Sequence, residues 1–166
     1  MEAFLARIAL PPLAGMSSKE RFACDEAAAG RRGHAPAPMT AWLKNLEFAR
    51  RAQRVGEFVR FEFSLPPRLR ELAVLIVSRY WSAHYEWRID KNEALKHGLG
   101  AEVVEIVASR RPPSFDSPAE RVVYDFAASL LETRSAPEAL YHEGLRALGE
   151  TWIVELVGVI GCYIFD

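Results

Sequence analysis

The stretch SPAERVVYDFAASLLETRSAPEAL, residues 117–140, contains two helix starts and decides the fold class. At 117–120 and again at 135–138 a serine is followed three residues later by a glutamate, which is the pattern of a capping box. The serine oxygen and the glutamate carboxylate can each satisfy a backbone N–H at a helix start, and Pro118 occupies the favoured first helical position. Residues 17–20 form a third box. Three such starts predict a mostly helical fold.

Glycines and prolines divide the rest of the chain. They mark a loop at 30–38, a stop at 98–100 and a linker within the domain at 111–114. Thr40 is expected to cap a second helix, and weak alternation predicts a short extended stretch at 58–65. Further helices are expected at 18–29, 67–98, 101–109, 118–132, 137–148 and 151–165. We therefore expect an all-α, single-domain helical bundle over residues 1–166, with about seven to eight helices.

Composition excludes several classes of function. The chain has 166 residues, 21 Lys and Arg against 22 Asp and Glu, and a net charge of −1, so it lacks the basic footprint of a nucleic-acid binder. No uninterrupted apolar run approaches the roughly 20 residues of a membrane span. Residues 1–16 lack the basic start and cleavage site of a secretory signal, which predicts a cytoplasmic protein. Cys24 and Cys162 fit no CxxC or zinc spacing and are interpreted as small buried residues.

The segment RLRELAVLIVSRYWSAHYEWRIDKNEALKHGL, residues 68–99, resembles the carboxymuconolactone decarboxylase family, which shares its fold with the alkylhydroperoxidase D-like peroxidases. The resemblance lies in residues 69–75 and 85–87 and in Ala94, Gly98 and Leu99. Residues 154–156, Gly161 and Tyr163 extend it to the last helix, so it covers most of the chain. It implies a bundle of the alkylhydroperoxidase D-like type, a small carboxylated substrate, no cofactor, and assembly as a trimer, hexamer or dimer.

The resemblance also places a family site in this segment, with residues 1–40 as an N-terminal helix and loop and 67–99 as the site-bearing part. The glutamate of the peroxidase branch corresponds to Glu71, its two cysteines to Ala83 and Glu86, and its histidine to Asp90. Without thiols no nucleophile attacks a peroxide, so peroxidase activity is disfavoured. Asp90 also replaces the histidine of the non-thiol members.

Decarboxylation needs a cation to hold the carboxylate and an acid to protonate the resulting carbanion or enolate. Arg79 or Arg88 can supply the cation. Histidine exchanges protons near neutral pH, which makes His84 the best acid, and Glu71 or Glu86 can take that role if buried. The predicted catalytic residues are Glu71, His84, Glu86 and Asp90, the predicted substrate-binding residues are Arg79, Tyr85, Trp87 and Arg88, and no metal is expected.

Geometry constrains this site. Glu71 and Glu86 are 15 residues apart, which is about 22 Å along one helix. They share a site only if the helix breaks near 81–83, and we expect such a break with Ser82 as the N-cap of the second half.

Three alternatives stay open beside the enzyme. Glu86 and Asp90 can belong to a structural ion cluster, and the protein can be a catalytically degenerate binding or assembly subunit of the same fold. Asp90, Glu93 and His97 share a helical face and are metal-ligand types, but they match no established motif. The last helix, 151–165, is apolar nearly all round, which favours burial or a subunit interface.

Overall fold

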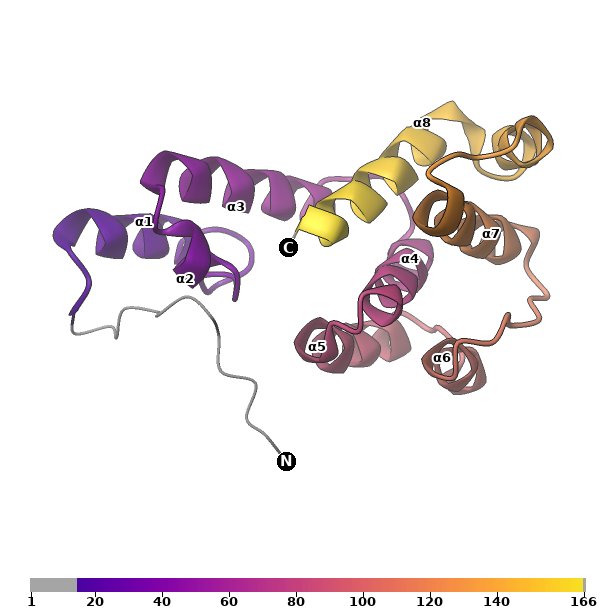
Figure 1. The fold of residues 1–166 in the computed structure, drawn as a ribbon, viewed down its shortest axis with the longest axis horizontal. Coiled ribbons are helices and arrows are strands. Elements are labelled where there is room, and N and C mark those ends of the chain that lie inside the picture. Colours follow the sequence, from indigo (N-terminus) through magenta and orange to yellow (C-terminus); the bar gives the residue numbers. More distant parts are fainter. Residues whose placement is uncertain (1–14, 166) are drawn as a thin grey trace. The chain divides into compact units, whose positions relative to one another are not determined.

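The computed structural model describes residues 15–165, and every regular element in that range is an α-helix. Eight helices occur there, which confirms the all-α prediction. The chain divides into two compact units, Met1–Glu62 and Phe63–Asp166. The helices of both units are labelled in Figure 1.

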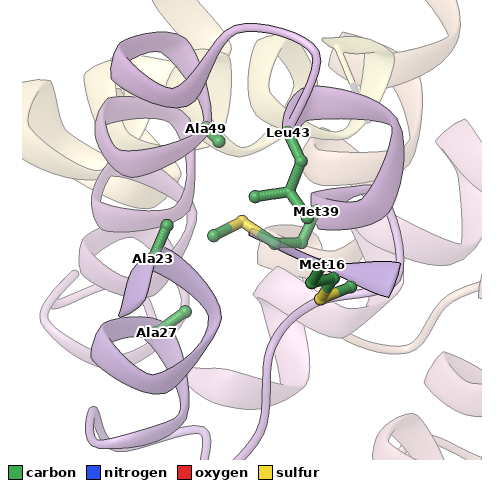
Figure 2. Packing of buried hydrophobic residues seen from close by; sticks show 6 residues of the cluster. All are labelled: Met16, Ala23, Ala27, Met39, Leu43 and Ala49. Atoms are coloured by element: carbon green, nitrogen blue, oxygen red, sulfur yellow. The ribbon is translucent and has the colours of Figure 1, made fainter. Parts of the chain in front are cut away.

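The first unit contains α1 (Ser18–Ala28), α2 (Met39–Trp42) and α3 (Leu46–Phe61). The capping box of α1 is confirmed, because Ser17 Oγ accepts from Glu20 N and the Glu20 carboxylate accepts from Ser17 N. Small apolar side chains and two methionines fill the space between the helices (Figure 2), namely Met16, Ala23, Ala27, Met39, Leu43 and Ala49. Arg50 and Arg54 of α3 both bind the carboxylate of Glu26 in α1.

Two predictions in this unit are wrong. Thr40 does not cap a long helix, since α2 has only four residues. Asn45 caps α3 instead, with its Oδ1 accepting from Phe48 N at 3.1 Å. The expected extended stretch begins inside a helix, because α3 continues to Phe61. The weak alternation there falls on an amphipathic helix whose solvent-facing side includes Val55 and Phe58.

The second unit contains α4 (Pro67–Tyr80), α5 (His84–Lys96), α6 (Ala101–Ala108), α7 (Pro118–Thr133) and α8 (Glu138–Phe165). Helix α4 contacts each of the other four, and Figure 1 shows α5 and α6 on one side of it and α7 and α8 on the other. Ten consecutive residues of α4, 69–78, are buried on all sides. The apolar residues of this run are therefore the centre of the unit's core.

The predicted break within 67–98 is confirmed, because α4 ends at Tyr80 and α5 starts at His84. The predicted role of Ser82 is wrong. Ser82 has a left-handed backbone with φ of 55°, and Ala83 occupies the N-cap position without a side-chain bond. The turn is closed by the backbone, since Ala83 N donates to Ser78 O at 2.8 Å.

The predicted separation of two helices near the C-terminus is also confirmed. Gly149 interrupts α8 with φ of 79° and ψ of 168°, a conformation that is essentially restricted to glycine. Within the described chain, α8 is the one helix long and apolar enough to cross a membrane by length and composition. Glu155, in its second half, accepts hydrogen bonds from the backbone N–H groups of Ser64 and Leu65, so this half is anchored to the segment before α4.

Candidate functional site

The turn between α4 and α5 forms one wall of a hollow of about 220 Å³, which we call the turn hollow. Its lining includes residues from the end of α4, the turn, the start of α5 and the end of α6. The polar and aromatic side chains among them are Ser78, Arg79, Ser82, His84 and Trp87. Three of the residues predicted from the sequence, Arg79, His84 and Trp87, therefore meet in one place because the helix breaks at 81–83.

Arg79 is the cation of the turn hollow. It is half-buried, and its Nε donates to the carbonyl oxygen of Ala108 at 2.6 Å. This bond fixes the plane of the guanidinium, while its two terminal nitrogens have no bond to any residue in the range 15–165. A planar guanidinium with two open nitrogens matches the geometry of a carboxylate.

Arg79 lies before the helix break at 81–83, and His84 and Trp87 lie after it. His84 is the first residue of α5 and is exposed to water, so it can exchange protons with solvent. Trp87 is half-buried and lies about one turn further along the same helix. The turn hollow therefore combines a cation, a proton donor and an aromatic wall.

Glu71 lies apart from the residues that line this hollow. It is buried in α4 with 1% exposure, and its Oε1 accepts from Arg70 Nη2 at 3.1 Å and Arg70 Nε at 3.3 Å. Its Oε2 is buried and has no hydrogen-bond partner within the described residues. This arrangement is a buried ion pair between sequence neighbours in the core of the second unit.

The remaining predicted residues of α5 also lie outside the lining of the turn hollow. Asp90 is fully buried. Glu86 is half-buried in the first turn of α5, where a carboxylate is favourable to the helix dipole. Tyr85 and Arg88 are exposed. The sequence thus predicted the break between the two helices, but the structure gathers only some of the predicted polar residues around it.

The described residues include no cluster of side chains suited to metal binding or to thiol chemistry. No group of three or more His, Cys, Asp or Glu side chains is arranged to hold a metal ion within residues 15–165, and this includes the pattern of Asp90, Glu93 and His97. Neither Cys24 nor Cys162 forms a disulfide within the described residues, and both are partly buried. Burial raises the pKa of the Cys24 thiol, which disfavours the reactive thiolate.

A second hollow of about 180 Å³ shares Arg79 with the first, and we call it the arginine hollow. Arg110 and Arg111, which follow α6, and Tyr124 and Glu132 of α7 also line it. Sequence reasoning assigned Arg111 only to a linker. The sequence did contain a signal for a local concentration of positive charge, because two adjacent arginines directly follow a predicted helix and precede two prolines.

Comparison of the chain with protein-family models, with curated proteins and with solved structures finds no match.

Proposed function

We propose that this protein is a carboxymuconolactone decarboxylase-like lyase, which removes CO2 from a small carboxylated lactone or a similar acid without a cofactor. The observation that supports the proposal is the meeting of Arg79, His84 and Trp87 in the turn hollow. These residue types supply the anion binding, the proton and the apolar contact that the reaction needs.

In the proposed reaction, the open nitrogens of Arg79 bind and orient the substrate carboxylate. The bond between the carboxylate carbon and the adjacent ring carbon breaks, CO2 leaves, and the electron pair moves toward the conjugated lactone carbonyl as an enolate. Protonated His84 then donates a proton to the ring carbon and regains one from water, to which its side chain is exposed. Trp87 packs against the ring and keeps it between the two groups.

The proposal extends to the setting of the enzyme. We propose that it acts in the cytoplasm on a small molecule, with neither nucleic acid nor a membrane as a partner, and that it is a homo-oligomer. The support for assembly is an exposed apolar face on the second half of α8 that includes Val154, Val157 and Ile164. Contiguous apolar surface of this kind is typical of an interface.

The test is CO2 release from a panel of small carboxylated lactones. Wild type is expected to turn over at least one of them, and His84→Gln to lower kcat by about 10²–10⁴-fold. Arg79→Met is expected chiefly to raise KM. His97→Gln is the matched control, since His97 lies at the other end of α5 and is exposed. No release from any compound, or equal activity of His84→Gln and wild type, overturns the proposal.

A degenerate binding protein is the second candidate. It is favoured by the positions of Glu71, Glu86 and Asp90, because three of the four predicted catalytic residues lie outside the lining of the turn hollow. Such a protein binds the carboxylated compounds, with weaker binding in Arg79→Met, but releases no CO2 from them. Peroxidase activity stays disfavoured, because Ala83 and Glu86 occupy the cysteine positions implied by the family resemblance.

A further inference from the structure

We propose that the arginine hollow is a second binding site, and that it takes a small organic dianion, a phosphate monoester with a compact apolar body. This site is separate in function from the lyase proposed above, although both use Arg79. The inference rests on guanidiniums that have no carboxylate partner in the described chain, on the backbone that holds Arg110 and Arg111, and on the residues that line the hollow.

The arginines of this hollow differ from many others in the chain. Arginines elsewhere in the described range bind glutamates, among them Arg31, Arg50, Arg51, Arg54, Arg68, Arg70 and Arg121. In contrast, Arg79, Arg110 and Arg111 have no carboxylate at ion-pair distance among residues 15–165, although Glu132 lines the same hollow. Three cations that line one space, with no carboxylate of the described residues at ion-pair distance from any of them, form a site for an external anion.

The backbone holds the two arginines after α6 in a defined position. Arg111 N donates to Ile106 O at 3.2 Å and Arg110 N donates to Val107 O at 2.9 Å, which is the pattern of a Schellman ending. The residue in the left-handed position of this motif is usually glycine, but here it is Arg110 with φ of 56°. The two backbone bonds therefore fix where Arg110 and Arg111 lie beyond the end of α6.

Side-chain bonds fix two of the three guanidiniums before any ligand arrives. Arg110 Nη2 donates to Ser82 Oγ at 2.9 Å, and Ser82 is itself left-handed with φ of 55°. Arg79 is held through its Nε by Ala108 O. Groups that are already ordered lose less conformational entropy on binding, so the site is preorganised for an anion.

The other residues that line the arginine hollow indicate which further chemical groups the ligand carries. Ile76, Val107 and Leu131 supply an apolar surface that fits a compact apolar body. Tyr124 is half-buried, and burial raises the pKa of its phenol, so the hydroxyl keeps its proton and can donate to an anionic oxygen. Three guanidiniums and the single carboxylate of Glu132 leave a formal excess of two positive charges. A phosphate monoester balances this excess better than a monocarboxylate does.

Phenyl phosphate is the probe, and isothermal titration calorimetry of the full chain is the assay. Wild type is expected to bind phenyl phosphate more tightly than inorganic phosphate, which lacks the apolar body, and benzyl alcohol is expected not to bind. Arg111→Gln is expected to weaken binding of phenyl phosphate by at least about tenfold, as loss of a charge-assisted bond predicts. Raising the salt concentration should weaken binding further.

Controls separate this site from the lyase site. Arg134→Gln removes an exposed arginine that also has a left-handed backbone, φ of 61°, at the end of a helix, but lies outside both hollows. It should bind phenyl phosphate as wild type does. His84→Gln, which affects only the turn hollow, should also bind normally. The proposal is overturned if phenyl phosphate does not bind, if Arg111→Gln binds it unchanged, or if Arg134→Gln weakens binding equally. A failure to release CO2 from lactones leaves these outcomes unaffected.

Discussion

The buried pair of Arg70 and Glu71 gives the sharpest prediction about stability. Both residues lie in the core of the second unit, with 8% and 1% exposure. Arg70→Met removes the only recorded partner of the Glu71 carboxylate within the described chain. The carboxylate is then left buried without a counter-charge, and such changes cost about 3–5 kcal/mol of unfolding free energy.

The double variant Arg70→Met and Glu71→Met should behave very differently. It removes both charges and replaces them with unbranched apolar side chains. Because Glu71 Oε2 already has no hydrogen-bond partner in the described residues, the native pair does not fully offset its own desolvation. The unfolding free energy of the double variant should therefore lie within about 1 kcal/mol of the wild-type value or exceed it. The two substitutions then show a coupling energy of at least about 2 kcal/mol.

Urea unfolding followed by circular dichroism measures these free energies. Lys91→Met is the control in the same unit, because it breaks the Lys91–Glu105 pair, whose side chains are 35% and 66% exposed. Its cost should stay under about 1 kcal/mol. If Arg70→Met costs no more than this control, or if the double variant loses the sum of the two single losses, the reasoning is refuted. The double variant should also keep any CO2 release, since neither residue lines the turn hollow.

Three further predictions concern the backbone and ionisation. Gly149→Ala should lower the unfolding free energy of the second unit by about 1–3 kcal/mol because only glycine adopts its backbone readily. Gly161 is helical and has open space where a Cβ would lie, so it should tolerate alanine. Equal losses of unfolding free energy for Gly149→Ala and Gly161→Ala in chemical denaturation would contradict this explanation. Hydrogen bonds from two arginines lower the pKa of Glu26 to about 2, so Glu26→Gln should destabilise the first unit at pH 7 by about 1 kcal/mol. The difference from wild type should shrink as the pH falls from 5 toward 2, and a constant difference would exclude the ionised pair as its cause. Burial raises the pKa of Asp125, so Asp125→Asn should stabilise the second unit at neutral pH, and melting curves should show the gain vanish in acid, where the wild-type carboxyl is protonated.

Much of the fold was predictable because its signals are local. Capping serines, prolines at helix starts and glycine stops act within a few residues, so most helix limits followed from the sequence. Ser82 shows where this fails. A serine before a helix is a common N-cap, but here its hydroxyl accepts from Arg110, which is 28 residues away. Competition from a distant side chain cannot be seen in a local pattern.

The candidate site, like the fold, was predictable only where it depends on local sequence signals. Arg79, His84 and Trp87 flank one turn, so the prediction of a break at 81–83 was enough to bring them together. The arginine hollow requires the packing of α4, α6 and α7, which no spacing in the sequence reveals. Glu71 was assigned to a site by resemblance, yet its place in an apolar run already favoured burial with its neighbour Arg70.

Helix α6 contributes residues to both hollows, and polar links add to its apolar contacts in holding it in place. Only Val104 and Val107 of this helix are buried. Its carbonyl at Ala108 accepts from Arg79, its Glu105 binds Lys91, and the residue just beyond it, Arg110, donates to Ser82. Links of this kind are individually weak when exposed, so α6 is held less firmly than the buried α4. A dianion bound by Arg79, Arg110 and Arg111 would join the end of α4 to the end of α6 directly. The same guanidinium of Arg79 would then be shared with the turn hollow, which gives a physical route by which occupancy of one hollow alters binding in the other.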